Sequence, residues 1–468
     1  MAQSLTVIPS ARRLMDSLRD IGYELPAAVA DLVDNSIDAD ATQVDIIVAF
    51  EGENSWIRIA DDGTGMPASQ MNEALRYGTD RDYDETDLGK FGLGLKTASL
   101  SQCRRLTVAT RTNPDRREIE IRRWDLDHVH EADGWELLRL RPSEVREEIV
   151  EPLQDGPGTV VMWEVLDRVL DYRLPSGAAA ENGLAAICRD IEAHLSMVFH
   201  RFLAQQARRA LPLTITMQGN PIDAWDPFAR EEEHTVKLDR QTISFRHAGR
   251  THNLRLQPYI MPNQVQFSTT RAWEAASGPK KWNRQQGFYI YRGGRMIQSG
   301  GWNRLRTLDE HTKLARVAID IPRPADTAFG INVSKMRVLI PNELRADLRA
   351  FASAVANRAQ TAYRQTGESH SDQGSFGGDS TGAAADSGGG SPVNVHGNGS
   401  AAGDPTGGST ADGSGSNGFS ENGSLSWDAL KDVLRAELSD QPEMLERLLT
   451  ALRRVVDKRP EPRERSSR

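Results

Sequence analysis

The sequence predicts a mixed α/β (α+β) protein, in which two folded domains are followed by a linker and a helical C-terminal segment. Helical and strand-like patterns alternate through the first 364 residues. No apolar run approaches the roughly 18 residues that suggest a membrane-spanning helix. Composition changes abruptly near residue 365. We therefore expect domains at residues 1–170 and 171–364, a linker at residues 365–424 and helices at residues 425–457.

The first domain begins with helical spacing and continues with short strand-like runs. Apolar residues recur at intervals of three and four, which predicts helices at residues 10–21, 26–38 and 68–77. Runs rich in β-branched and aromatic residues predict strands at residues 44–50, 56–59, 106–111, 118–124 and 159–165.

The second domain has the same mixture of patterns. A long helical pattern at residues 180–206 crosses the expected domain boundary. Strands are expected at residues 213–217, 242–246, 253–258, 288–291 and 317–321, and a final helix at residues 343–364.

The C-terminal part has the composition of a linker and then of short helices. Residues 366–424 hold 17 glycines and 12 serines. They bury too little apolar surface to offset the entropy of ordering them, so we expect a disordered linker. Residues 425–456 regain helical spacing, which Pro442 divides into two helices. This pair could be a small autonomous hairpin, or it docks on an unknown protein partner or on the chain itself.

Charge and cysteine content exclude several classes of protein. The chain has 57 basic and 66 acidic residues and a formal net charge of −9. This excludes a protein coated in positive charge but leaves room for a local basic groove. Cys103 and Cys188 are the only cysteines, which excludes a disulfide scaffold and a four-cysteine zinc site. The N-terminus lacks the apolar core of a signal peptide, so we expect a soluble, cytoplasmic protein without a membrane partner.

The first of three motifs lies on the predicted helix at residues 26–38. Asp31, Asn35 and Asp38 share one helix face through i, i+4 and i+7 spacing, beside an apolar face. A carboxylate can polarise a water molecule, and an amide oxygen is a hard ligand that suits Mg²⁺. The same pattern is also typical of an amphipathic helix with a solvated acidic face.

The second motif is a DxGxG turn that follows a predicted strand. Asp61 precedes Gly63 and Gly65, and glycines at alternate positions permit a ligand to approach the backbone closely. The carboxylate can accept a hydrogen bond from an exocyclic amine. An ordinary Asp-Gly turn between strand and helix is the alternative.

The third motif is a glycine-rich segment, LGKFGLGLKTAS, at residues 88–99. Glycines followed by an apparent helix suit phosphate binding by backbone N–H groups, and Lys96 adds a mobile positive charge. The pattern is neither a Walker A loop nor a dinucleotide fingerprint. Taken alone, a glycine-rich loop is weak evidence.

In this order and spacing, the three motifs resemble those of the GHKL ATPase superfamily, which includes gyrase B, MutL, histidine kinases and a heat-shock chaperone. Residues 158–163, GTVVMW, look like the family's later Gly-Thr strand. The closest resemblance is to MORC-like and MutL-like members, and ADLVDNSIDA and GKFGLGLKTAS look like the MORC forms of both motifs. The resemblance implies a GHKL (Bergerat) ATP-binding sandwich, followed by an S5-like α/β transducer domain. Residues 215–220, 226–228, 288–295 and 329–335 are similar to transducer segments of that group.

The resemblance also implies ATP and Mg²⁺ as cofactors and gives roles to the motif residues. Asp31 would be the general base and Lys335 would sense the γ-phosphate, which makes these two the expected catalytic residues. Asn35 would hold Mg²⁺, Asp61 would bind the adenine amine, and Thr159 would support that contact. The other expected ATP contacts are Asp38, Gly63, Gly65, Met66, Gly89, Gly92, Gly94, Leu95 and Lys96. From the residues alone, Lys96 and Lys335 are also compatible with ordinary surface lysines.

The sequence departs from the family at the general base. Most members have Glu four residues before the magnesium asparagine, and this chain has Asp31. Aspartate is one methylene shorter, and a misplacement of about one ångström can cost roughly a hundredfold in rate. Either the pocket compensates, or the protein is a slow ATPase that acts as a switch.

A basic segment with interleaved aromatic residues predicts contact with duplex DNA. No acidic residue occurs between Glu274 and Asp309, and such a stretch suits phosphate contact and base stacking. The expected DNA-binding residues are Lys280, Lys281, Arg284, Arg292 and Arg295, and the aromatic residues are Trp282, Phe288, Tyr289, Tyr291 and Trp302. The alternative is a solvated strand face whose aromatic residues belong to the core.

These observations together predict a slow, MORC-like or MutL-like ATPase that acts as an ATP-gated, homodimeric clamp or switch on DNA. By resemblance to bacterial relatives, a DNA-modification or defence system is the expected setting. A chaperone-like ATPase for protein clients and a non-hydrolysing ATP-binding scaffold remain open. The absence of a long client-binding middle domain argues against the chaperone, and the absence of a phospho-acceptor helix argues against a histidine kinase.

Overall fold

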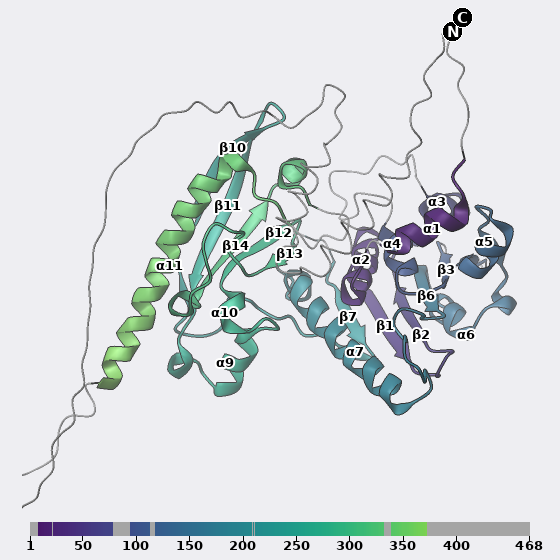
Figure 1. Ribbon diagram of the computed structural model, residues 1–468, viewed down its shortest axis with the longest axis horizontal. Coiled ribbons are helices and arrows are strands. Elements are labelled where there is room, and N and C mark those ends of the chain that lie inside the picture. Colours follow the sequence, from purple (N-terminus) through teal and green to yellow (C-terminus); the bar gives the residue numbers. More distant parts are fainter. Residues whose placement is uncertain are drawn as a thin grey trace, which may run out of the picture. The chain divides into compact units, whose positions relative to one another are not determined.

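The structure is a computed structural model that describes residues 8–20, 22–77, 94–112, 118–207, 209, 211–331 and 338–371, with side chains to residue 364. The chain divides into two units, residues 1–379 and 380–468, and every described residue belongs to the first. The expected linker beyond residue 371 and the expected C-terminal helices therefore lie outside the described residues. Residues 365–371, which were expected to be linker, instead continue a helix. Two β-sheets with their covering helices make up the described part (Figure 1).

The first sheet has eight strands and takes its members from two distant parts of the sequence. Neighbouring strands are antiparallel except for the parallel pair β1–β7. In spatial order the strands are β5 (Leu138–Leu140), β4 (Glu120–Asp125), β3 (Arg105–Arg111), β6 (Gly158–Glu164), β2 (Trp56–Asp61), β1 (Gln43–Ala49), β7 (Thr214–Met217) and β8 (Asn220–Pro221).

Most of the helices pack on one face of this sheet, and fewer pack on the other. On β1, Val44, Ile46 and Val48 alternate with more exposed residues and point into the main core, as the two-residue period of a strand requires. This core is closed by α1 (Ala11–Arg19), α2 (Leu25–Asp38), α3 (Ala68–Leu75), α4 (Gly94–Leu100), α5 (Leu126–Ala132) and α7 (Ala178–Val198). A smaller core on the opposite face includes Ile149 of α6 (Glu147–Val150) and Leu153.

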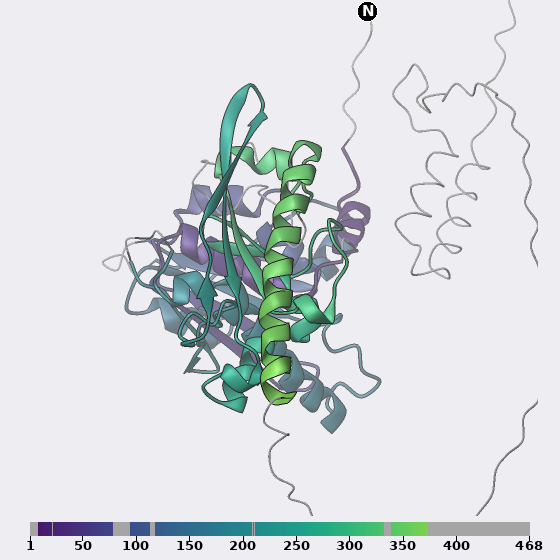
Figure 2. The same ribbon diagram turned by 90° about the vertical axis from the view of Figure 1, so that its left-hand side faces the viewer.

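The second sheet has five main strands, with the short β9 (Val236–Lys237) added to β11. Their spatial order is β10 (Gln241–His247), β11 (Arg250–Ile260), β14 (Ala315–Ile321), β12 (Gly287–Arg292) and β13 (Arg295–Ser299). The long helix α11 (Asn342–Ser371) packs on one face of this sheet, and the β10–β11 hairpin extends beyond the other strands (Figure 2). The smaller helices of this part are α8 (His200–Leu203), α9 (Thr270–Ser277) and α10 (Lys281–Gln285).

The expected domain boundary after residue 170 is wrong for the sheet. β7 and β8 follow that boundary, yet β7 pairs with β1 from Gln43↔Thr214 to Ile46↔Met217. This pairing is non-local, so local periodicity gave no sign of it. The first sheet therefore extends to Pro221. The long helix expected at residues 180–206 is also interrupted, because Phe199 ends α7 and precedes α8.

The basic and aromatic segment is mostly interior, which corrects part of the expected DNA-binding surface. β12 lies inside the sheet and is covered on both faces, so Phe288, Tyr289 and Tyr291 are fully buried. Arg292 and Arg295 are also buried, and each pairs with buried carboxylates. Of the five expected DNA-binding residues, Lys280, Lys281 and Arg284 are exposed. The alternative that places the aromatic residues in the core is confirmed for β12 and Trp302.

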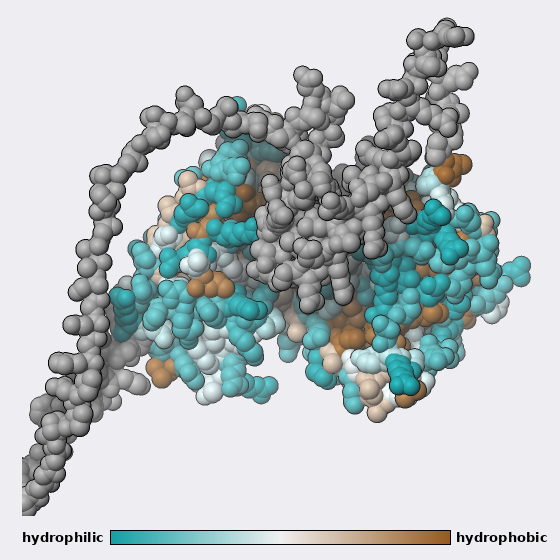
Figure 3. Space-filling model, viewed as in Figure 1, coloured by the Kyte–Doolittle hydropathy of each residue, from teal (hydrophilic) through white to brown (hydrophobic). Residues whose placement is uncertain are grey.

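One face of the described residues has the polarity expected for contact with water. Hydrophilic residues cover most of the face shown in Figure 3, and hydrophobic ones form small separate patches there. In the part of the chain that the structure describes, every helix is too short or too polar to cross a bilayer.

Candidate functional site

Helix α2 carries the first motif and lies deep in the main core. It begins at Leu25 with Pro26 in its first turn, where the missing N–H of proline has no helical partner to lose. It packs against β2, α4 and α7. Asp31 is only 2% exposed, whereas Asn35 and Asp38 are exposed. Along the expected shared face, exposure to solvent therefore increases from the buried Asp31 carboxylate to the accessible Asn35 amide.

Tyr23, just before α2, and Arg295, from β13, both contact the Asp31 carboxylate. The Tyr23 hydroxyl donates a hydrogen bond of 2.9 Å to Oδ2, and the Arg295 guanidinium lies 3.6 Å from Oδ1. Burial, followed by the nearby Asp31 charge, raises the pKa of Tyr23 above its usual value, so its proton remains available for donation. The same Oδ2 atom lies 3.7 Å from the position that a Cβ would take at Gly94. Asp31 therefore faces the start of α4, which lies within the third motif.

Arg295 reaches α2 from β13 of the second sheet. Its Nε lies 2.7 Å from Oδ2 and 2.9 Å from Oδ1 of Asp34. Asp34 has no exposed surface and Arg295 is only 2% exposed. Two carboxylates of one helix thus share a buried guanidinium, whose planar fork suits such a contact. The structure places Arg295 at this site rather than on a DNA-binding surface.

Asp61 lies at the end of β2 and accepts three hydrogen bonds. The Ser36 hydroxyl donates at 2.8 Å, the Gly63 N–H at 3.0 Å and the Thr159 N–H at 3.2 Å. Burial raises the pKa of the Asp61 carboxyl to about 6, and these hydrogen bonds limit the rise. The expected residues Asp61, Gly63 and Thr159 are thus brought together. Ser36 also ties this carboxylate to α2.

The glycines of the second motif are required by close packing. Gly65 has a φ of +66°, and a Cβ there would lie 2.1 Å from the Arg111 carbonyl oxygen. The turn is also fixed by the Met66 N–H, which donates to the Thr110 hydroxyl at 2.8 Å. At Gly63 a Cβ would lie 2.8 Å from the Ala39 carbonyl oxygen. These glycines hold the turn against β3 and the end of α2.

The third motif is described only from Gly94 onward. Lys96 has no exposed surface, and its ammonium donates to the Ala74 carbonyl at 2.8 Å. Burial lowers the pKa of Lys96 to about 8. The alternative that Lys96 is a solvated surface residue is therefore wrong. Leu95 packs against the main core. Gly89, Gly92 and Lys335 lie outside the described residues.

The exposed end of α2 has the donor chemistry that Mg²⁺ requires. The Asn35 amide makes no hydrogen bond to any described residue and is accessible to solvent. Among these residues no group of three histidine, cysteine or acidic side chains is placed to hold a metal. Mg²⁺ commonly keeps several waters and takes few protein ligands together with substrate phosphates. A single amide oxygen next to the expected nucleotide site fits that pattern.

Sequence reasoning missed four groups that shape the site. Tyr23 and Arg295 hold Asp31, Asp34 shares the guanidinium, and Ser36 holds Asp61. Asp34 and Ser36 stand within the first motif, so their positions next to Asp31 and Asn35 were a usable signal. Arg295 lies 261 residues from Asp34, and nothing local indicates that contact.

Comparisons with known proteins agree with the geometry of the first domain. Residues 23–159 match the family model of the histidine kinase-, DNA gyrase B- and HSP90-like ATPases. A DNA mismatch repair protein MutL from Shewanella woodyi is 43% identical over 95 residues, which cover 19% of this chain and 15% of the relative. MutL from Shewanella piezotolerans is 38% identical over 127 residues, which cover 26% and 19%. The matched segments thus span less than a fifth of these relatives.

One solved structure also resembles the chain at low similarity. It is a crystal structure of the N-terminal domain of a DNA repair protein, which covers 76% of this chain and 98% of its own. The sequence identity is 18% and the TM-score is 0.42.

Replacing Arg295 by methionine should destabilise the protein strongly. The change removes the guanidinium that Asp31 and Asp34 share in the interior, and breaking a buried pair in this way costs about 3–5 kcal/mol. Urea unfolding followed by circular dichroism measures the loss. The matched control is Arg284→Met on the exposed surface of α10, which should change stability by less than about 0.5 kcal/mol. Equal, small losses in both variants would show that the Arg295 contact contributes little.

Proposed function

Because residues 23–159 form a domain of the GHKL ATPase family, we propose that the chain binds ATP with Mg²⁺ and hydrolyses it slowly. The observation that carries the proposal is the Asp61 carboxylate, which the Thr159 and Gly63 N–H groups and Ser36 orient at the end of β2. An oriented acceptor beside a glycine turn suits the exocyclic amine of adenine.

The described residues supply distinct functions for this reaction. Asp61 accepts from the adenine amine and so selects adenine. Asn35 holds Mg²⁺, which when bound neutralises phosphate charge. Asp31, oriented by Tyr23 and Arg295, accepts a proton from the attacking water. Because Asp31 is shorter than glutamate and shares its oxygens with two partners, we expect slow turnover.

We further propose that ATP binding gates a homodimeric protein that acts on DNA. The relatives that match the first domain carry the name DNA mismatch repair protein MutL. The exposed Lys280, Lys281 and Arg284 offer a smaller basic surface than the sequence predicts, which would give weak, salt-sensitive contact with duplex DNA. Glycines of the third motif and Lys335 would close over the phosphates, and the C-terminal helices would recruit a protein partner. The setting of a DNA-modification or defence system stays a prediction.

Hydrolysis of Mg-ATP by the purified protein and by Asp31→Asn tests the enzymatic proposal. Asparagine keeps the size of the side chain but cannot accept the proton, so turnover should fall at least about a hundredfold while the affinity for ATP is retained. Equal turnover in both proteins would contradict the role of Asp31. Adding duplex DNA or an unfolded protein to the wild type distinguishes the DNA-acting ATPase, which DNA stimulates, from a chaperone.

The affinity for ATP should weaken as the pH falls below about 6. The Asp61 carboxyl has a raised pKa of about 6, so its protonated form, a poorer acceptor, dominates below that pH. Affinity should then fall by about tenfold per pH unit. The phosphate groups of ATP also titrate near this pH and affect both proteins equally. The affinity of the wild type is therefore divided by the affinity of Asp61→Asn at each pH. If the ratio of the two affinities stays constant between about pH 5 and about pH 8, adenine recognition by Asp61 is contradicted.

A further inference from the structure

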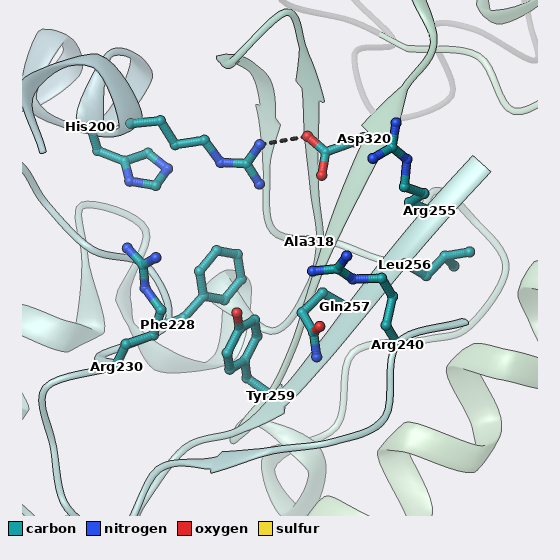
Figure 4. Close-up of a pocket in the computed structure, with 11 residues that line it drawn as sticks. His200, Phe228, Arg230, Arg240, Arg255, Leu256, Gln257, Tyr259, Ala318 and Asp320 are labelled. Atoms are coloured by element: carbon teal, nitrogen blue, oxygen red, sulfur yellow. Dashed lines mark hydrogen bonds and ion pairs between the residues drawn. The ribbon is translucent and has the colours of Figure 1, made fainter. Parts of the chain in front are cut away.

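An arginine-lined cavity of about 150 Å³ lies on the second sheet, apart from the residues of the nucleotide site. Leu254 and Leu256 of β11 belong to the core that packs on α11, whereas Tyr259 belongs to the core on the other face. Arg255, Gln257 and Tyr259 alternate with those leucines, so they share the face opposite α11. Figure 4 shows these side chains around the cavity.

Four arginines from different elements converge on this cavity. Arg201 belongs to α8 and Arg255 to β11, while Arg230 and Arg240 come from the segments before β9 and β10. Figure 4 shows the guanidinium groups of Arg230, Arg240 and Arg255 on different sides of the space. Asp320 is the one acidic residue among those that line it. The lining is therefore strongly positive.

Two of these arginines are fixed by ion pairs, and two have no partner among the residues that the structure describes. Arg201 pairs with Asp320 at 2.5 Å, and its guanidinium lies 3.4 Å from the centre of the Tyr291 ring. Arg230 pairs with Asp226 at 2.9 Å. Neither Arg240 nor Arg255 makes a hydrogen bond or ion pair with any described residue. The second pair can therefore bind an anion without first breaking a contact.

His200 provides a buried polar atom without a partner on the wall of the cavity. It is only 1% exposed, and its Nε2 lies 2.9 Å from the Tyr291 hydroxyl. Burial lowers the pKa of His200 to about 3, so the ring is neutral near pH 7. Its Nδ1 has no hydrogen-bond partner among the described residues. When Nε2 accepts from Tyr291, the proton is on Nδ1, and such a buried donor is unfavourable unless an acceptor arrives.

We propose that this cavity binds the phosphate group of a phosphomonoester. Guanidinium groups that approach from several directions suit a tetrahedral anion, whereas one planar carboxylate is matched by a single guanidinium edge. The cavity is smaller than the roughly 300–1,000 Å³ of pockets that hold drug-sized ligands. It therefore accommodates the phosphate group and leaves the rest of the ligand outside. The ligand is either a small phosphomonoester or the 5′-phosphate end of a DNA strand.

Titration calorimetry of the full chain with inorganic phosphate tests the proposal. Arg240→Gln combined with Arg255→Gln should lower the affinity for phosphate at least tenfold, because it removes both unpaired charges. Both side chains are exposed, so the fold should be retained, as thermal melts will verify. The matched control is Arg246→Gln, an exposed arginine of β10 outside the cavity, which should bind phosphate as the wild type does.

Further ligands distinguish the two sources of phosphate. Glycerol phosphate binding that depends on Arg240 and Arg255 supports a small ligand. A DNA duplex with a 5′-phosphate that binds more tightly than its 5′-hydroxyl counterpart, with the difference lost in the double variant, supports a DNA end. The proposal is overturned if phosphate does not bind, if the double variant binds it like the wild type, or if acetate binds as tightly as phosphate.

Discussion

The buried guanidinium of Arg295 determines how the helix of the first motif lies in the structure. It comes from β13 of the second sheet and is shared by Asp31 and Asp34 of α2. Taking a charge out of water costs several kcal/mol per ion, which only close partners offset. α2 therefore cannot leave β13 without separating these buried charges. The apolar surroundings reinforce the contact, because Met296 of β13 and Val33 of α2 belong to one continuous core.

Through α2, this contact reaches both parts of the proposed nucleotide site. The middle of the helix presents Asp31 to the start of α4, and Ser36, further along the same helix, donates to the Asp61 carboxylate. The end of the helix also fixes the glycine turn, because the Ala39 carbonyl accepts from the Thr64 N–H at 2.9 Å. The proposed base and the proposed adenine acceptor are thus placed by one rigid element, which is the arrangement that precise chemistry requires. A shift of β13 would therefore move both the proposed base and the proposed adenine acceptor.

The sequence predicted the main helices and strands and the three motifs, because those features are local. It could not predict contacts whose partners are far apart in the chain. The Arg295–Asp34 pair and the parallel β1–β7 pairing are the clearest cases. The prediction that β12 contributes to a DNA-binding surface failed for another reason. A strand that is buried on both faces loses its two-residue alternation, so FYIYR resembles a basic aromatic surface as closely as it resembles a core strand. Burial of Lys96 was likewise invisible, since its acceptor is the backbone carbonyl of Ala74.

The most direct test of this account is a double-mutant cycle between the second sheet and α2. The free energy of unfolding would be measured for the wild type, Arg295→Met, Asp34→Asn and the double variant. If the buried pair joins the two elements, removing the Asp34 charge should recover part of what Arg295→Met loses. The coupling free energy should then be about 1–3 kcal/mol. Losses that simply add, with a coupling near zero, would contradict the claim that Arg295 determines the position of α2.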